Sequence, residues 1–181
     1  MSKSPLSSLR HFEPVCEVDE LVALWPHVGE AAVLVRELKY RRTTAVVSAL
    51  AEPMAELAPA ADLVTWVPAT PARRRERGFD QSELLARAIA RRARLKARRM
   101  LRRVDNRAQT GRNRDGRIEG PTIAPAGRLL RSGPTVLLID DVCTTGSTLR
   151  ACARVLRSSG AVRVVALVAT QVEARPTTHT P

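Results

Sequence analysis

The sequence predicts an α/β fold in which helices flank an open parallel sheet. The first observation is the run 135–139, which is apolar, rich in β-branched residues and free of Gly and Pro, as is typical of a strand buried on both faces. The second is the segment after it, a hydroxyl-rich loop and a helix that ends near Gly160. The third is another strand, loop and helix over 62–99. Ligands of such sheets bind at the carboxyl ends of the strands.

The length and the composition fit one domain with a sizeable core. The chain has 181 residues, of which 44% are apolar and only 3% aromatic, so the core must be built from Ala, Val and Leu. The net charge is +12, from 30 Lys and Arg against 18 Asp and Glu. Two interpretations of this charge stay open: an Arg-rich composition that favours solubility, and an anionic partner such as a polyphosphate or a nucleic acid.

The cysteines and the N-terminal segment limit the cellular context. Cys16, Cys143 and Cys152 form an odd set without a close pair, which argues against a disulfide framework and against a C-x-x-C zinc site. The first ten residues are polar and no adequate apolar segment comes after them, so we expect no signal peptide. All apolar runs fall short of a membrane span. We therefore expect a cytoplasmic protein with no membrane association.

The N-terminal part begins with weak patterning and continues with two helices. We expect 1–28 to be a weakly patterned segment and 29–170 to be the domain. Helices are predicted over 29–40 and over 43–57. Pro53 lies inside the second helix, where it either kinks the helix or begins a new one.

The next unit is a strand, a loop and a helix. The strand is predicted over 62–67, and the loop after it, 68–77, begins with Pro and is rich in Arg. A helix begins at Asp80, which has capping-box spacing to Glu83. We expect this helix to become basic and to continue to Arg99, with its charged side as a solvated surface.

The second half holds a loop before the central strand and one more strand after it. We expect 100–104 to be a short strand and 105–125 to be a long, polar, basic loop. Such a loop inside a compact domain is either disordered or an active-site lid, and its place just before the central strand favours a lid. A last strand is expected over 162–169, and the polar tail 171–181 is expected to be disordered.

The end of the central strand contains the residues suited to chemistry. Asp140 and Asp141 stand there, and carboxylate oxygens suit vicinal hydroxyls or a hydrated Mg²⁺. The loop behind them combines hydroxyl donors, a glycine that allows close backbone approach, and a helix N-terminus that attracts anions. Its residues are Thr144, Thr145, Gly146, Ser147 and Thr148. A phosphate beside a diol describes a ribose 5-phosphate.

Two other interpretations apply to the same stretch. The Asp pair could cap the next helix after an ordinary strand, although a cap needs neither two acids nor several hydroxyls. The strand could be the Walker B strand of an NTPase, but the chain has no G-x-x-x-x-G-K-[ST] run.

Cys143 lies near a helix N-terminus, which can lower the pKa of a thiol and favour a redox role. Cys152 falls on the apolar side of the helix and is expected in the core.

The stretch Leu-Leu-Ile-Asp-Asp-Val-Cys-Thr-Thr-Gly-Ser-Thr, 137–148, resembles the signature of type I phosphoribosyltransferases, which bind phosphoribosyl pyrophosphate (PRPP). A second run, 75–86, is similar to the R-x-R-G-F-N-Q-x-x-x-L-A pattern of the ComF/GntX family. Leu38-Lys39-Tyr40 resembles the L-K-Y of that family. The resemblance covers about residues 30–170, and it implies the type I phosphoribosyltransferase fold.

The chain also departs from the pattern of this family. Asp80 replaces the usual Asn, and Gly120 stands where an Asn is expected in the lid. Many members begin with a four-cysteine zinc ribbon, whereas this sequence has only Cys16 in that region, so we expect no zinc.

The resemblance implies a glycosyltransferase that moves phosphoribosyl from PRPP to a nitrogen acceptor, with Mg²⁺ as cofactor. Asp140 and Asp141 would hold the ribose hydroxyls directly or through Mg²⁺, and the loop 144–148 would hold the 5-phosphate. The leaving pyrophosphate would bind Ala69, Thr70, Arg73, Arg75 and Arg77. The lid would close over the site with Arg103, Arg107 and Gln109.

The acceptor and the partners stay open at this point. Thr144 stands where hypoxanthine-guanine enzymes carry an Asp that serves the base, so we expect neither hypoxanthine nor guanine to be an acceptor. ComF-type proteins are linked to DNA uptake in competence. The alternative function is therefore a factor that binds single-stranded DNA or competence proteins without turnover. A homodimer and a degenerate relative without activity also stay open.

Overall fold

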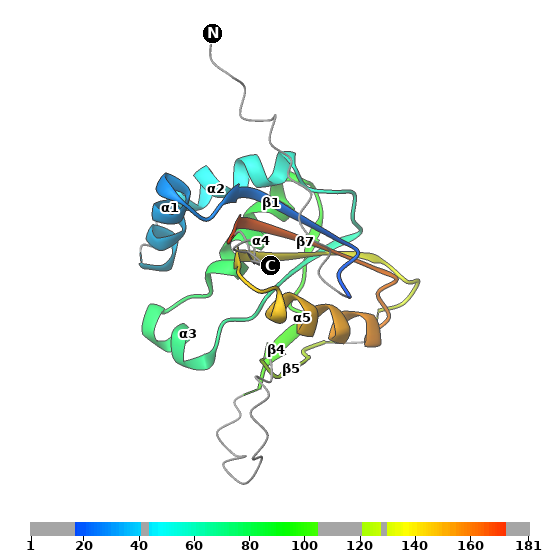
Figure 1. Ribbon diagram of the computed structural model, residues 1–181. Helices are drawn as coiled ribbons and strands as arrows, with labels where there is room; N and C mark the ends of the chain where they lie inside the picture. Colours follow the sequence, from blue (N-terminus) through cyan, green and yellow to red (C-terminus); the bar gives the residue numbers. More distant parts are fainter. Residues whose placement is uncertain (1–16, 41–43, 105–120, 128–129, 173–181) are drawn as a thin grey trace, which may run out of the picture.

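The computed structural model describes residues 17–40, 44–104, 121–127 and 130–172. It contains a five-stranded parallel sheet in the order β1-β7-β6-β2-β3 (Figure 1). The strands are β1 (Glu20–Pro26), β2 (Leu63–Trp66), β3 (Lys96–Ala97), β6 (Thr135–Cys143) and β7 (Arg163–Gln171). The predicted α/β class with an open parallel sheet and flanking helices is confirmed.

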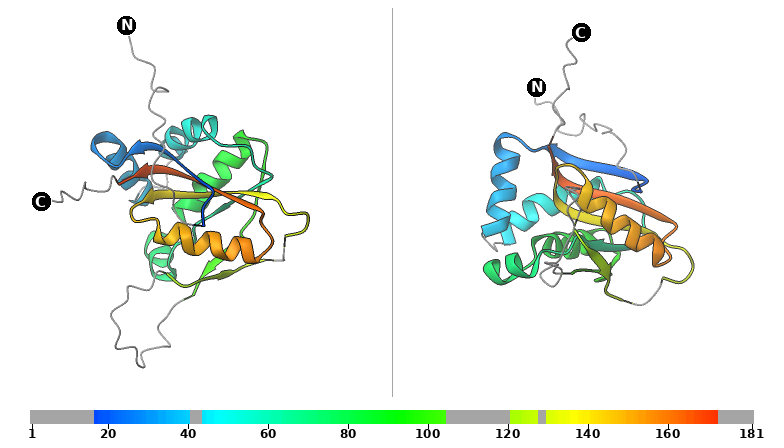
Figure 2. Two further views of the ribbon diagram at one scale, coloured as in Figure 1. Left: turned by 45° about the vertical axis from the view of Figure 1, so that its right-hand side comes forward. Right: turned by 60° about the horizontal axis from the view of Figure 1, so that its bottom comes forward.

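Helices cover both faces of the sheet, which is why the central strands are apolar throughout (Figure 2). One face packs against α1 (Gly29–Tyr40), α2 (Thr44–Glu56) and α4 (Gln81–Arg92). The other packs against α5 (Ser147–Ser158) and a small antiparallel hairpin of β4 (Leu101–Arg103) and β5 (Ile123–Pro125). Along β6, Val136 and Leu138 join the α5 core, while Leu137 and Ile139 join the other one.

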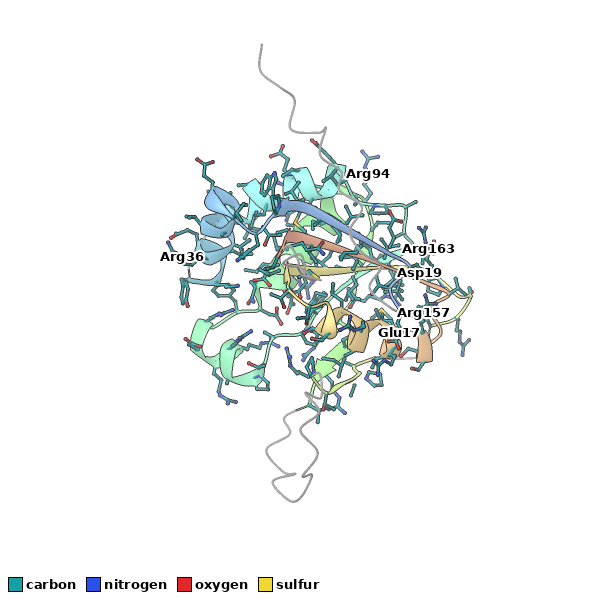
Figure 3. The ribbon with its side chains drawn as sticks, in the orientation of Figure 1. Glu17, Asp19, Arg36, Arg94, Arg157 and Arg163 are labelled. Atoms are coloured by element: carbon teal, nitrogen blue, oxygen red, sulfur yellow. The ribbon has the colours of Figure 1, made fainter. Side chains whose placement is uncertain are left out.

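The segment 1–28 contains a strand that the sequence pattern did not predict. Glu20–Pro26 pairs in parallel with β7 along most of its length, so the sheet begins before residue 29. Acidic side chains at its start form ion pairs with α5 and β7 at the amino edge of the sheet (Figure 3). The pairs are Glu17–Arg154 at 2.6 Å, Asp19–Arg157 at 2.5 Å and Glu20–Arg163 at 2.7 Å.

The stretch expected to be a loop after β2 contains the short helix α3 (Pro71–Arg77). The Thr70 hydroxyl accepts the Arg73 N–H at 3.2 Å, Pro71 takes an N-terminal position that needs no donor, and Gly78 ends the helix at φ 74°. The helix buries no side chain. Therefore only its caps, and no apolar periodicity, could have predicted it.

The basic helix and the lid also differ from expectation. α4 ends at Arg92, with Arg94 at a positive φ of 57°, and the chain continues into β3 instead of remaining helical to Arg99. Of the expected lid 105–125, only 121–125 is described, and it includes β5. Arg107, Gln109 and the tail 173–181 lie outside the described residues. No helix in the described ranges has the length and apolar character needed to cross a membrane.

Candidate PRPP site at the carboxyl edge of the sheet

The carboxyl ends of β2, β6 and β7 lie at one edge of the sheet, at the left of Figure 1, because all strands of a parallel sheet end on the same side. The helices α1 and α3 lie at the same edge. The structure thereby brings together three sequence-predicted groups, namely the acid pair, the loop 144–148 and the loop 69–77.

The acid pair is buried and fixed by hydrogen bonds. The Ser82 hydroxyl at the start of α4 donates to Asp140 Oδ1 at 2.9 Å, and the Asp141 N–H donates to the same atom at 2.9 Å. Burial raises the pKa of Asp140 well above 3.8, and the neighbouring carboxylate of Asp141 raises it further. The pair is therefore a site at which a cation or hydroxyl donors would relieve an electrostatic cost.

Two residues that the sequence pattern did not assign to the site contact Asp141. Lys39 Nζ, from the last turn of α1, lies 3.4 Å from Asp141 Oδ2. The Thr170 hydroxyl donates to the Asp141 carbonyl at 3.4 Å and is 2.7 Å from Nδ1 of His27. The L-K-Y resemblance pointed to Lys39 as a family residue, but only the fold shows its contact.

The loop after β2 is tied to the start of α4. The Ala69 N–H donates to Asp80 Oδ2 at 2.9 Å, while Asp80 Oδ1 accepts the Glu83 N–H at 3.3 Å and caps the helix. Burial raises the pKa of Asp80, although both hydrogen bonds oppose that shift. Arg103 Nη1 donates to the Pro68 carbonyl at 3.4 Å, which places this predicted lid residue beside the loop.

The loop after β6 has the features of an anion site. Gly146 adopts φ 70° and provides no side-chain cap for α5, so no side chain at the cap position accepts hydrogen bonds from the first N–H groups of the helix. Thr144 and Thr145 are exposed, and the Thr145 hydroxyl donates to Ser147 Oγ at 3.1 Å. Thr148 is half-buried in the first turn.

Cys143 does not have the activated thiol that its position near a helix N-terminus suggested. It is buried at the end of β6. Burial, together with the charge of Asp140, raises the pKa of its thiol to about 11. A redox role for this thiol is therefore disfavoured, and Cys152 lies in the core as expected.

Buried polar atoms without a hydrogen-bond partner gather at this edge. Within the described ranges such side-chain atoms occur in four residues: Arg77, Gln81, Asp141 and Gln171. The Asp141 atom is Oδ2, which has the Lys39 ammonium as an ion-pair partner at 3.4 Å but accepts no hydrogen bond. Arg77 follows the β2 loop, Gln81 begins α4, and the other two lie at or near the ends of β6 and β7. Each atom of this kind costs about 1–3 kcal/mol when it has no partner, so native proteins keep few of them away from functional sites.

The other predicted arginines of this region differ in their surroundings. Arg73 and Arg75 are exposed on α3. Arg77 is half-buried, and its guanidinium lies 5.9 Å from the centroid of the Tyr40 ring at the end of α1. Its Nε and Nη1 atoms are among the unpartnered donors.

The comparisons with known proteins agree with this fold. Residues 73–180 match the phosphoribosyl transferase domain family, and the chain belongs to that family. The chain is also similar to competence protein ComFC of Bacillus subtilis (strain 168), to which it is 33% identical over 94 residues. That match covers 52% of this chain and 38% of ComFC, so the chain spans well under half of its relative's length.

Solved structures support the fold alone. Glutamine PRPP amidotransferase from B. subtilis, in complex with ADP and GMP, superposes with a TM-score of 0.52 at 23% identity. A structure of the allosteric regulatory enzyme of purine biosynthesis superposes with a TM-score of 0.50 at 19% identity. Each match covers 74% of this chain and 30% of the other chain. They confirm the type I phosphoribosyltransferase-like sheet.

Proposed function

We propose that this protein binds PRPP with Mg²⁺ at the carboxyl edge and transfers its phosphoribosyl group to a nitrogen acceptor. The observation that supports this most directly is the gathering of buried polar atoms without a hydrogen bond, in Arg77, Gln81, Asp141 and Gln171, around a PRPP-type motif. A polyanionic, hydroxyl-bearing ligand offers acceptors to the arginine and donors to the three side-chain oxygens.

The 5-phosphate and the ribose would bind along β6 and α5. The N–H groups at the start of α5 and the hydroxyls of Thr144, Thr145, Ser147 and Thr148 would hold the phosphate, and Gly146 leaves room for it. Asp140 and Asp141 would accept hydrogen bonds from the ribose hydroxyls.

The pyrophosphate would bind along the loop after β2. The backbone of Ala69 and Thr70 and the side chains of Arg73, Arg75 and Arg77 supply donors there. Arg103 approaches this loop through Pro68, and we assign it, with Arg107 and Gln109, to closure over the substrate and exclusion of water.

The reaction is a substitution at C1 of the ribose. The lone pair of the acceptor nitrogen forms the N–C1 bond, and the bond from C1 to the pyrophosphate oxygen breaks. Its electron pair departs with pyrophosphate, and a proton on the nitrogen passes to solvent or to a nearby base. The protein contributes position and stabilisation of charge on the departing group through its arginines and backbone N–H groups.

The acid pair suits a hydrated Mg²⁺. The described residues contain no group of three or more His, Cys, Asp or Glu side chains that could hold a metal, and Mg²⁺ in proteins typically takes only one or two carboxylates together with substrate phosphates and water. Asp140 and Asp141 would be those carboxylates. When bound, Mg²⁺ would neutralise negative charge on the pyrophosphate.

Calorimetric titration with PRPP, with and without Mg²⁺, tests the proposal. We expect saturable, Mg²⁺-dependent binding to the wild type and its loss when Asp140→Ala and Asp141→Ala are combined. Asp62→Asn is the matched control, because Asp62 accepts the Thr135 N–H at the other end of the strands. Unchanged binding to the double variant would refute the assignment. Pyrophosphate release with hypoxanthine or guanine would separately refute our expectation that neither is an acceptor.

A second candidate function is binding of nucleic acid, and an exposed basic surface favours it. This surface begins at the end of α4 and runs through β3 and β4: Arg91, Arg92, Arg94, Lys96, Arg98, Arg99 and Arg102. The name of ComFC connects that relative with competence. Titration with single-stranded DNA at two salt concentrations tests it, because electrostatic binding weakens steeply with salt. Weak binding that does not respond to salt would exclude this function.

A further inference from the structure

A pocket of about 400 Å³ lies along α1, beside the candidate site. It is lined by His27, which precedes the helix, and by five residues of α1: Ala32, Val33, Arg36, Lys39 and Tyr40. This volume suits a small molecule. None of these residues has a role in the binding of PRPP as proposed above.

Two residues that line the pocket are also connected to the acid pair of the candidate site. Lys39 is the residue that contacts the Asp141 carboxylate, and His27 reaches the Asp141 carbonyl through Thr170. Tyr40 lines the pocket, and the centroid of its ring lies 5.9 Å from the Arg77 guanidinium. A molecule in this pocket would therefore lie next to the residues assigned to ribose and to pyrophosphate.

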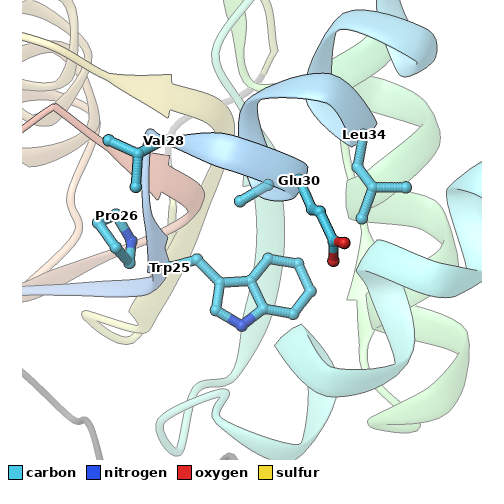
Figure 4. A pocket seen from close by; sticks show the side chains of 6 residues that line it. Trp25, Pro26, Val28, Glu30 and Leu34 are labelled. Carbon is cyan, nitrogen blue, oxygen red and sulfur yellow. The ribbon is translucent and has the colours of Figure 1, made fainter.

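The described residues that line the pocket include two cations, Arg36 and Lys39, and no carboxylate. Lys39 already has Asp141 as its counter-ion, whereas Arg36 is exposed and forms no ion pair within the described ranges. The pocket on the other side of α1 differs: it is lined by Trp25, Pro26 and other apolar residues together with Glu30 (Figure 4). One unpaired guanidinium matches a single negative charge, and Arg binds carboxylates with two parallel hydrogen bonds.

The pocket also offers an aromatic surface. The Tyr40 side chain is 69% exposed at its rim, and Tyr40 is the one aromatic residue among the described lining residues other than His27. A planar ring gains from contact with such a side chain. The pocket therefore combines a cation for a carboxylate with a surface for a ring.

We propose that this pocket binds the nitrogen acceptor and that the acceptor is a planar, ring-containing carboxylate, held by Arg36 and Tyr40. The inference rests on the proposed function and specifies its substrate class. The bonds formed and broken are those of the substitution above, and the carboxylate is unchanged by the reaction.

The test uses the full chain, labelled with ¹⁵N, and compounds that differ in a carboxylate. The pairs are nicotinate with nicotinamide, orotate with uracil, and anthranilate with aniline. We expect at least one carboxylate to bind, to shift the amide signals of 32–40, and to bind at least about tenfold more tightly than its neutral partner. Arg36→Gln should remove this preference and Arg36→Lys should restore part of it. Arg131→Gln, which removes the same charge in the turn before β6 begins, at the amino edge of the sheet, should leave it intact.

Several results would overturn the inference. No binding by any carboxylate, equal affinities within every pair, or a preference that survives Arg36→Gln would each do so. So would displacement of the carboxylate by inorganic pyrophosphate, because the pocket would then belong to the pyrophosphate subsite. PRPP titrated into the same samples separates the two proposals. PRPP binding without a carboxylate preference refutes only this inference. A carboxylate preference without PRPP binding instead refutes the proposed function, and the pocket then remains as a site for anions.

Discussion

At the scale of single residues, stability and binding have opposite requirements at Asp140. Its carboxyl is buried beside another carboxyl, and both effects raise its pKa. Asp140→Asn removes the charge, while the amide oxygen can still accept from Ser82 and from the Asp141 N–H. We expect the variant to gain about 1 kcal/mol and thus about 2–4 °C in Tm, and to lose Mg²⁺-dependent binding of PRPP. Thermal unfolding and calorimetry measure the two effects, and a less stable variant that still binds PRPP would contradict both.

The same carboxyl predicts a pH dependence. The folded-state pKa of Asp140 is raised above the ordinary value of 3.8, so the folded protein holds this proton more tightly than the unfolded chain. Its contribution to stability therefore falls as pH rises from about 3.8 to the raised pKa. Binding of PRPP with Mg²⁺ requires the carboxylate, so affinity should fall below the raised pKa by up to about tenfold per pH unit. Titrations in two buffers of different ionisation enthalpy would detect the released proton, and a pH-independent affinity without proton release would contradict this mechanism.

At the scale of elements, two glycines that end helices allow the cost of a left-handed backbone to be compared with the added cost of a steric clash. Gly78 ends α3 at φ 74°, and a Cβ added there would meet no atom within 4 Å, whereas a Cβ at Gly160, at φ 105°, would lie 2.6 Å from the Leu130 carbonyl oxygen. Gly78→Ala should cost about 1–2 kcal/mol, the strain of a left-handed residue. Gly160→Ala should cost more, because the chain at Leu130 must also move. Urea unfolding of both variants checks this order, and equal losses would contradict it.

The elements also show which features sequence patterns can predict. The central strands and α5 were predicted because a strand buried on both faces leaves a continuous apolar run, and a helix on a sheet leaves a regular stripe. β1 was missed because its Trp25-Pro26 end resembles a turn and its partner strand lies far away in the sequence. α3 was missed because a helix that buries nothing has no stripe.

In the candidate site, too, the sequence predicts residues that share a local pattern but not residues that meet only through packing. The acid pair and the loop 144–148 are adjacent in sequence, so their motif predicts them together. Lys39 comes from another part of the chain and meets Asp141 only through the packing of α1 on the sheet. His27 contacts the Thr170 hydroxyl, which in turn donates to the Asp141 carbonyl. The unpartnered atoms of Gln81 and Gln171 likewise depend on burial by the whole fold, which no local pattern encodes.

At the scale of the whole molecule, the two edges of the sheet have different tasks. At the amino edge, charges are paired, and Asp19 Oδ2 accepts both the Val164 N–H at 2.7 Å and the Arg157 guanidinium. Burial alone would raise the pKa of Asp19, but these two hydrogen bonds and the positive charges of Arg157 and Arg163 together outweigh it and lower the pKa. This stabilisation is therefore present above about pH 4 and is lost as pH falls through the lowered pKa. The carboxyl edge instead keeps buried polar atoms without partners.

This division predicts that stability and ligand binding can be changed independently. Asp19→Ala should lower the free energy of unfolding by about 1–3 kcal/mol, because it leaves a backbone N–H and an arginine without their acceptor. PRPP with Mg²⁺ should then stabilise the variant and the wild type by the same amount, about 2.7 kcal/mol at a hundred times Kd. Asp140→Asn should show the converse, a stable fold that the ligand does not stabilise further. Thermal unfolding of the three proteins with and without ligand checks both halves. A ligand effect that changes with Asp19→Ala would mean that the amino edge and the site are coupled through β7, the strand that joins Val164 to Thr170 and Gln171.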